Sequence, residues 1–308
     1  MSRRINNPAI ASTLKSQDTE EPIDIYFYRP LGYWWALLFE RLGVSPNAVT
    51  IASIFLGVAA GFCFYFRNLG INLLGMFLLV WANTYDSADG QLARMTGRKS
   101  ALGRILDGFS GDLWFFTIYV AICLRLMPGW GLWIWVLAAV TGYCHSKQAA
   151  MADYYRNVHL LFLKGKAGSE LSNSIALREE FGRMSWRREA FFKLANFFYT
   201  AYTRGQEQLS PKLQGLLALL RGKYGTKGTP DAAFREAFRE AFREKSLPLM
   251  KYTNMLSFNL RAIVLFLALA LDLPWLYFLF ELTILNAMLI YMVSRHEKIC
   301  DGFTKALA

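Results

Sequence analysis

The chain has 308 residues, of which 54% are hydrophobic and 16% aromatic, and it carries a formal net charge of +11. These apolar fractions exceed those of ordinary soluble domains, so the composition favours an integral membrane protein over a soluble all-helical protein. The four cysteines are scattered, which argues against a zinc motif or a disulfide framework.

The chain begins with two segments that precede the first apolar stretch. Residues 1–25 are polar and contain no apolar core beside a small-residue cleavage site, so we expect a flexible polar tail rather than a secretory signal. Residues 26–42 mix aromatic and apolar side chains with charged ones. This pattern predicts a helix in the membrane interface, with Trp34 and Trp35 at headgroup depth. A simple surface helix is the alternative.

Six apolar stretches approach the roughly 20 residues that a spanning helix needs. They are residues 49–66, 71–85, 105–126, 130–150, 255–271 and 275–293. The second and third are short, but both border an acidic run, residues 86–112, which contains Asp86, Asp89, Asp107 and Asp112. A polar helix end is expected where a spanning helix lines a protein cavity. The predicted fold is an all-α integral membrane protein with six transmembrane helices, an N-terminal interfacial helix and a helical cytoplasmic insertion.

The distribution of Lys and Arg predicts the orientation. The turns after the first, third and fifth stretches carry few basic residues, whereas Arg94 and Arg98 follow the second and Arg295 follows the sixth. The positive-inside rule then places both termini, the acidic run and the long connection between the fourth and fifth stretches in the cytoplasm. The expected parts are a tail (1–25), a catalytic part (26–154), a basic insertion (155–251) and a closing part (252–308).

The insertion, residues 155–251, carries most of the positive charge, and aromatic residues lie among the basic ones. This mixture predicts a helical layer that rests on anionic lipid headgroups. Beside six apolar stretches, a nucleic-acid partner is not expected. Within the insertion, Phe234, Phe238 and Phe242 recur every four residues, which predicts an amphipathic helix packed on the membrane or on its own domain.

The acidic run between the second and third stretches has the residue types of a metal-bound phosphate site. Asp86 and Asp89 are three residues apart, so on a helix they share one face and both can point at one ion. Ligands with oxygen alone favour Mg²⁺ or Mn²⁺. Gly90 and Gly103 leave room for an anionic ligand, and Arg94 offers phosphate-matching geometry.

The run resembles the signature of the CDP-alcohol phosphotransferases, D-x2-D-G-x2-A-R-x8-G-x3-D-x3-D. The matching positions are Asp86, Asp89, Gly90, Ala93, Arg94, Gly103 and Asp107. Residues 46–50, Pro-Asn-Ala-Val-Thr, and the six apolar stretches also resemble that family. The resemblance covers roughly residues 26–150 and, by topology alone, the last two stretches.

The resemblance implies transfer of a substituted phosphoryl group from a CDP-activated donor to an alcohol acceptor, with release of CMP, in phospholipid or sphingolipid headgroup biosynthesis. Two divalent ions, Mg²⁺ or Mn²⁺, would clamp the diphosphate. The implied metal ligands are Asp86, Asp89, Asp107 and Asp112, and the implied nucleotide or substrate residues are Gly90, Ala93, Arg94 and Gly103. By analogy with the family, the protein could form a homodimer.

One position departs from the family pattern. The fourth aspartate is expected at position 111, which is Gly111, and Asp112 follows one residue later. A shift of one residue turns a side chain by about 100° on a regular helix, although a local π-bulge would restore its direction. Asp112 is the shifted candidate for the catalytic base, beside Asp107. The alternatives are a base from elsewhere or a catalytically degenerate relative that acts as a membrane scaffold or carrier.

The identity of the substrates stays open at the level of the sequence. The donor could be CDP-diacylglycerol with a small polar acceptor, or a small CDP-alcohol with a lipid acceptor. Arg98 and Lys147 near the expected site would suit an acceptor that bears a phosphate, such as a polyol phosphate, although they also satisfy the positive-inside rule.

Overall fold

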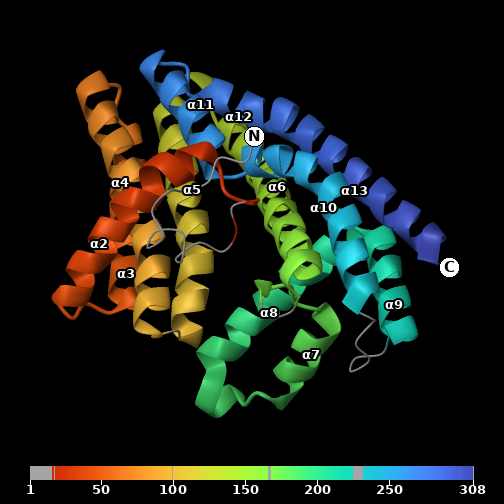
Figure 1. Ribbon diagram of the computed structural model, residues 1–308. Helices are drawn as coiled ribbons and strands as arrows, with labels where there is room; N and C mark the ends of the chain where they lie inside the picture. Colours follow the sequence, from red (N-terminus) through yellow and green to blue (C-terminus); the bar gives the residue numbers. More distant parts are fainter. Residues whose placement is uncertain (1–15, 17, 99, 166–167, 225–231, 308) are drawn as a thin grey trace. The chain divides into compact units, whose positions relative to one another are not determined.

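The computed structural model describes residues 16, 18–98, 100–165, 168–224 and 232–307, and these residues form helices and no strand. Most of the expected tail (1–25) lies outside the described residues. The elements, of which Figure 1 labels the α-helices, are η1 (Asp24–Tyr28), α2 (Arg29–Arg41), α3 (Pro46–Phe64), α4 (Leu69–Thr96), α5 (Ala101–Trp130), α6 (Trp133–Lys164), α7 (Ser174–Arg183), α8 (Trp186–Gln208), α9 (Pro211–Tyr224), α10 (Ala232–Met255), α11 (Phe258–Ala270), α12 (Trp275–Phe280), η3 (Glu281–Leu285) and α13 (Asn286–Leu307). The elements η1 and η3 are π-helical.

Every one of the six apolar stretches falls on helical structure. Among the described residues, four helical stretches are long and apolar enough to cross a membrane: Pro46–Phe64, Ile105–Trp130, Arg235–Ala270 and Trp275–Leu307. The prediction of an all-helical fold is therefore confirmed, and these four stretches are candidate membrane spans by length and composition. The count of six spans and the interfacial position of α2 stay predictions.

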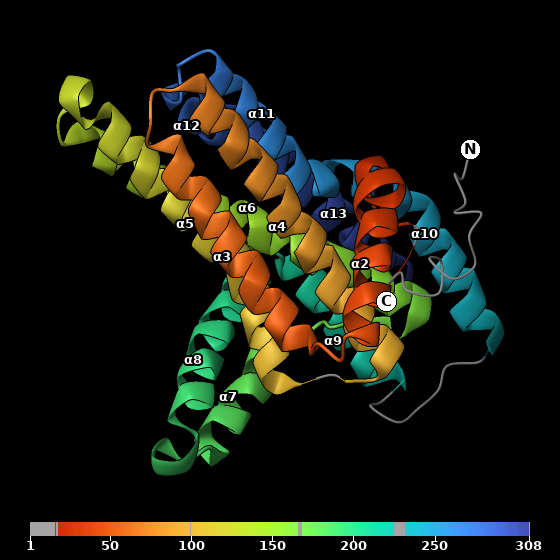
Figure 2. The ribbon, with the colours of Figure 1, turned by 90° about the vertical axis from the view of Figure 1, so that its left-hand side faces the viewer.

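The chain divides into two compact units. The first comprises Met1–Cys144 and Asn259–Leu282, and the second comprises His145–Phe258 and Thr283–Ala308. In the first unit α4 packs on both α2 and α3, and α3 also packs on α5. Figure 2 shows α3 and α4 running side by side, with α2 against the later part of α4. Two of these helices, α4 and α5, carry the four aspartates of the acidic run.

Small residues allow the helices of the first unit to approach closely. A Cβ atom on Gly57 of α3 would lie only 2.1 Å from Cδ1 of Trp114 in α5. Likewise, a Cβ atom on Gly75 of α4 would lie 2.6 Å from the ring of Phe64 in α3. A larger residue at either position would force these helices apart, so the two glycines set the spacing of the bundle.

The first unit also holds two buried arginines, each paired with a carboxylate, of which Glu281 is buried and Asp272 is 63% exposed. Arg125 of α5 donates to Asp272 at 2.7 Å and to the carbonyl oxygen of Phe64 at 3.0 Å. Arg261 of α11 donates to Glu281 at 2.7 Å, and both side chains are at most 1% exposed. Charges buried in this way are tolerated because each is paired, and removing one partner is strongly destabilising.

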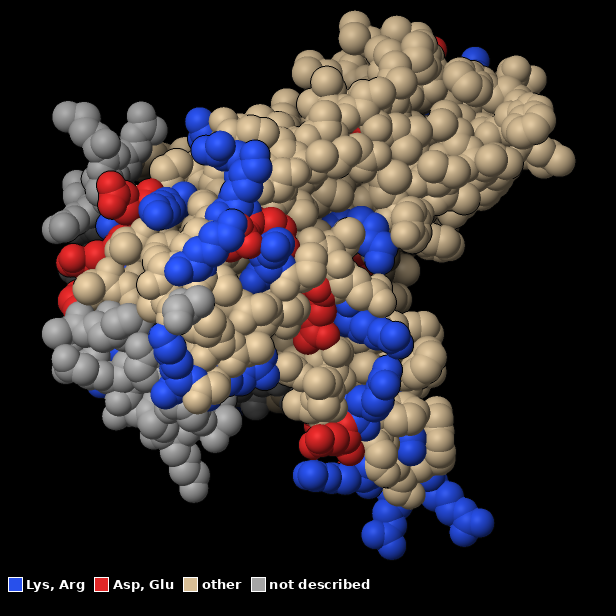
Figure 3. All heavy atoms as spheres, turned by 90° about the vertical axis from the view of Figure 1, so that its right-hand side faces the viewer, with Lys and Arg blue, Asp and Glu red and all other residues tan. Residues whose placement is uncertain are grey.

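The second unit has its own aromatic core. The rings of Tyr155 in α6 and His296 in α13 stack with centroids 4.0 Å apart. Phe242 of the predicted aromatic stripe is buried between Phe162 and Phe303, so this stripe packs within its own unit. The side chain of Phe234 lies outside the described residues. Figure 3 shows the right-hand side of Figure 1, where Lys and Arg side chains gather with fewer acidic ones over the region of α9, α10 and the end of α13.

Candidate active site

The acidic run occupies the adjoining ends of two helices. Helix α4 ends at Gly97, whose φ of 69° is left-handed backbone that a glycine adopts without strain. After a short connection, Ser100 caps α5 by accepting a hydrogen bond from the backbone N–H of Gly103 at 2.9 Å. The end of α4 and the start of α5 are therefore joined by a short connection, residues 97–100.

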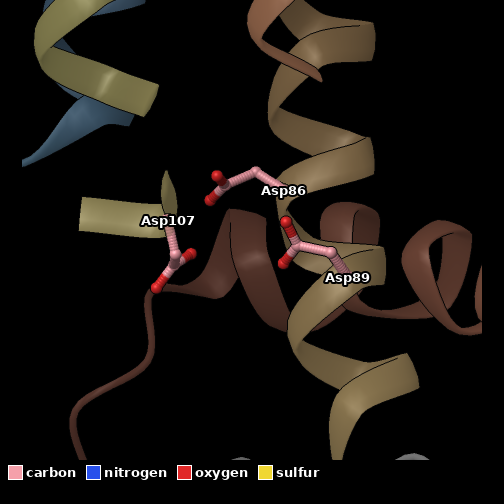
Figure 4. A group of neighbouring side chains, drawn as sticks. All are labelled: Asp86, Asp89 and Asp107. Carbon is pink, nitrogen blue, oxygen red and sulfur yellow. The ribbon is translucent and has the colours of Figure 1, made fainter. Parts of the chain in front are cut away.

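Three of the four predicted carboxylates come together at this junction. Asp86, Asp89 and Asp107 each have a carboxylate oxygen within 4.8 Å of the others, and Figure 4 shows two of them on one helix and the third on its neighbour, facing a common space. Asp89 is 4% exposed, Asp86 is half-buried and Asp107 is exposed. Two unit negative charges 4.8 Å apart repel each other by about 3.5 kcal/mol at an effective dielectric constant near 20, and a bound cation would offset this repulsion.

Two hydroxyl groups orient these carboxylates. Thr50 of α3 donates to Oδ2 of Asp89 at 2.5 Å, and its Oγ1 also lies 3.1 Å from the carbonyl oxygen of Pro46. Ser110 of α5 donates to Oδ1 of Asp86 at 3.0 Å. The sequence pattern included Thr50 only in residues 46–50, which resemble the family, and it indicated no site role for Thr50 or Ser110. The structure shows that each holds one carboxylate in place.

Gly103 has a packing role that the sequence did not indicate. A Cβ atom at this position would lie 2.5 Å from Oδ1 of Asn47 and 3.0 Å from Oγ of Ser100. Oδ1 of Asn47 in turn accepts a hydrogen bond from Ser100 at 3.1 Å. Gly103 therefore lets the first turn of α5 approach the first turn of α3, which brings Asp107 toward the site that contains Thr50.

Arg94 lies back over Gly90, one turn earlier on α4. Its guanidinium nitrogens are 3.4 and 3.5 Å from the position that a Cβ atom on Gly90 would occupy. Arg94 is close enough to attract Asp89 and Asp107 electrostatically. Its Nε is buried and donates to no atom among the described residues. A buried N–H without an acceptor is costly, and an oxygen of a bound phosphate would satisfy it. Ala93, beside it, is half-buried.

A second arginine, Arg29, is near enough to the aspartates to act on them electrostatically, whereas the sequence placed it only in an interfacial helix. Arg29, the first residue of α2, attracts Asp86 electrostatically. Its backbone carbonyl accepts a hydrogen bond from Nε2 of Gln91 at 3.1 Å. No spacing rule links residue 29 to the acidic run, because the two meet only through the packing of α2 on α4.

Asp112 is exposed and is not among the three residues of the cluster. Helix α5 runs as α-helix from Ala101 to Trp130, and the π-helical segments among the described residues lie elsewhere. On a regular helix, five residues separate Asp112 from Asp107 by about 140° of rotation, whereas position 111 lies about 40° away. A Cβ atom on Gly111 would have no atom within 4 Å. The family position of the fourth carboxylate is thus sterically open.

Comparison with known proteins agrees with this geometry. Residues 43–157 match the model of the CDP-alcohol phosphatidyltransferase family. This segment belongs to that family. It contains the whole acidic run, Thr50 and Ser110, whereas Arg29 precedes it. With the four apolar helical stretches, the match of residues 43–157 to this family indicates a multi-pass membrane protein.

Two relatives show how far the similarity extends. The bifunctional IPC transferase and DIPP synthase of Aquifex aeolicus is 31% identical over 98 residues, which are 32% of this chain and 22% of that protein. The archaetidylinositol phosphate synthase of Pyrococcus horikoshii is 33% identical over 89 residues, 29% of this chain and 46% of that protein. The chain thus spans less than half the length of these relatives.

Proposed function

We propose that the chain transfers a substituted phosphoryl group from a CDP-activated donor to an alcohol acceptor and releases CMP. One observation carries this proposal: the segment that matches the CDP-alcohol phosphatidyltransferase family gathers Asp86, Asp89 and Asp107 within 4.8 Å. A scaffold would have no physical need for three adjoining carboxylates at the end of an apolar helix.

The carboxylates fit divalent ions. Their oxygen ligands suit Mg²⁺ or Mn²⁺, and the site has more negative charge than its neighbouring groups offset. Asp86, Asp89 and Asp107 would hold the ions, two by analogy with the family, while Thr50 and Ser110 keep Asp89 and Asp86 in position. When bound, such ions neutralise the charge of a diphosphate during its displacement.

The chain's own residues then account for binding and for proton transfer. The acceptor oxygen forms a bond to the donor's distal phosphorus, the bond from that phosphorus to the CMP oxygen breaks, and the hydroxyl proton passes to a carboxylate. Asp107 is exposed and lies within the cluster, so an acceptor hydroxyl can reach it. Asp112 stays the shifted candidate for the fourth carboxylate, on the same helix.

Arg94 is the residue that we expect to bind the donor phosphate. Its unpartnered Nε and its position over Gly90 suit an oxygen of the donor diphosphate, and the absence of a side chain at Gly90 keeps the guanidinium close to the helix. Ala93 and Gly103 complete the nucleotide-binding residues of the proposal; Gly103 acts through the close contact that it permits with Asn47.

For the acceptor, we favour a polyol phosphate. The name of the Pyrococcus horikoshii relative describes synthesis of archaetidylinositol phosphate, whose headgroup is a phosphorylated polyol. Basic side chains at the site, Arg29 and Arg94 among them, suit a substrate with an additional phosphate. The favoured donor is accordingly a CDP-activated lipid such as CDP-diacylglycerol.

The arrangement in the membrane is part of the same proposal. The positive-inside pattern supports six spans with both termini and the active site in the cytoplasm. Residues 155–251 would form a cytoplasmic insertion against anionic headgroups, between the catalytic part (26–154) and the closing part (252–308). A homodimer rests on family analogy.

The test is acceptor-dependent release of CMP. The purified protein, with Mg²⁺ or Mn²⁺, is incubated with CDP-diacylglycerol or small CDP-alcohols and a panel of polyols, polyol phosphates and lipid alcohols. We expect CMP only when donor, acceptor and ion are all present, and we expect none from Asp89→Asn. Asp301→Asn, which removes a surface carboxylate paired with Lys212 and Lys305, is the matched control and should retain activity.

The second candidate function, a catalytically degenerate scaffold or carrier, is favoured by one observation: Gly111 stands where the family has its fourth aspartate. CMP binding without CMP release from any substrate pair would support that candidate and would contradict the transferase.

A further inference from the structure

An N-terminal pair of opposite charges lies at the site, ahead of the residues that match the family. Nη2 of Arg29 lies 2.8 Å from Oε1 of Glu20, and Nε of Arg29 donates to Oε2 of Glu20 at 3.2 Å. The contact is thus bidentate. The Arg29 and Glu20 side chains are 18% and 8% exposed, so this is not an ordinary surface ion pair. Because residues 43–157 match the family, neither residue belongs to the shared motif.

Several contacts fix this segment against the motif helix. Gln91, two residues after Asp89, donates to the carbonyl oxygen of Arg29 at 3.1 Å. Gly32 of α2 approaches α4 so closely that a Cβ atom would lie 2.8 Å from Nε2 of Gln91. On the other side, Asn259 of α11 donates to Asp24 at 2.9 Å. Backbone contacts and helix packing therefore hold Arg29 against α4, the helix that carries Asp86 and Asp89, in addition to the contact of its side chain with Glu20.

With two divalent ions at the aspartates, the balance of charge around Arg29 favours binding of an anion. Arg29 and Arg94 are near enough to repel each other, and Glu20 acts on both. The site has four carboxylates, those of Asp86, Asp89, Asp107 and Glu20, and two guanidinium groups, so its net charge without ions is −2. The two divalent ions of the proposed function would change this net charge to +2. A doubly negative phosphate group between the two arginines would restore neutrality.

We propose that Arg29 binds a phosphate group of a substrate, and that Glu20 is a positioning residue that holds the guanidinium of Arg29 toward the aspartate cluster. This inference rests on the proposed transferase function and names a residue outside the family motif. Two phosphate sources share this chemistry: the diphosphate of the CDP donor and a phosphate on the acceptor. Separate kinetics for the two substrates distinguish them.

The experiment compares four variants of the full-length protein by steady-state CMP release, with donor and acceptor varied in turn. Arg29→Gln removes the charge, Arg29→Lys keeps it without the forked geometry, and Glu20→Gln releases the positioning contact. Arg41→Gln is the matched control, because Arg41 is exposed at the opposite end of the same helix, about 18 Å along its axis.

We expect Arg29→Gln to raise the KM of one substrate about tenfold or more while kcat changes less than threefold, because the lost contact is a charge-assisted hydrogen bond to a bound group. Arg29→Lys should recover part of that KM, and Glu20→Gln should raise the same KM by less. An increased donor KM assigns Arg29 to the diphosphate, and an increased acceptor KM assigns it to an acceptor phosphate.

Two results would overturn the assignment. The first is Arg29→Gln with both KM values unchanged, whatever happens to kcat. The second is an equal KM change in Arg41→Gln, which would indicate a general effect of charge. If Arg29→Gln folds poorly, Arg29→Lys decides by the same KM comparison. Wild-type protein that neither releases nor binds CMP would refute the transferase and this inference together. Normal wild-type turnover with unchanged KM values in Arg29→Gln would refute the inference alone.

Discussion

The contact between Thr50 and Asp89 offers the sharpest test of the candidate metal site. Thr50→Val keeps the shape of a side chain that is 3% exposed and removes only the hydroxyl that donates to Asp89 at 2.5 Å. A hydrogen bond to a charged group contributes about 1.5–3 kcal/mol, and loss of a residue that orients a metal ligand typically weakens metal affinity about 10- to 100-fold. We therefore expect the metal concentration for half-maximal activity to rise by that factor.

The assay is CMP release measured across a Mg²⁺ or Mn²⁺ titration, with direct Mn²⁺ binding as a second readout. Thr141→Val is the matched control, since Thr141 is also buried and its hydroxyl donates at 2.8 Å to the carbonyl four residues earlier, as Thr50 also can. Activity of Thr50→Val should largely return at saturating ion. An unchanged metal requirement, or an equal change in Thr141→Val, would refute the reasoning that Thr50 orients a metal ligand.

Three further predictions concern the two helices of the cluster. Asp86→Asn and Asp107→Asn should each abolish CMP release while the protein still inserts into membranes, and turnover near the wild-type rate in either would contradict the metal assignment. Gly103→Ala should lower the free energy of unfolding by about 1–3 kcal/mol and reduce activity, because the added Cβ would lie 2.5 Å from Oδ1 of Asn47. Gly108→Ala is the control and should not be destabilising, because a Cβ there meets open space. Thermal unfolding in detergent compares the two variants. Gly111→Asp should raise metal affinity and CMP release, since a carboxylate there lies near the face of Asp107 and meets no neighbour. Lower activity of this variant would indicate that the chain's own residues already supply the catalytic base.

Several features of the fold were predictable because they depend on local periodicity and composition. Six apolar stretches each correspond to helical structure, and four helical stretches meet the length and apolarity of a span. The three-residue spacing of Asp86 and Asp89 placed both on one face of α4, because a helix turns about 100° per residue wherever it occurs. The seven-position motif identified the family before any contact was known.

Other features depended on contacts between segments far apart in the chain. The sequence indicated no reason for Gly103 beyond room for a ligand, whereas the structure shows a helix contact with Asn47. The aromatic stripe left open whether Phe242 faced a membrane or its own domain, and the structure buries it against Phe162 and Phe303. Packing of this kind depends on the shapes of both partners, which no periodicity in one segment encodes.

The sequence by itself determined the class of protein, the motif and the carboxylates available for metal binding, because residue types and helical spacing are properties of a single segment. Only the tertiary structure decided which groups surround those carboxylates. It brought Asp107 to Asp86 and Asp89, placed the hydroxyl of Thr50 on Asp89, and set Arg29 beside the cluster. The physical reason is that α2, α3, α4 and α5 meet through close helix packing, which acts between residues distant in the chain.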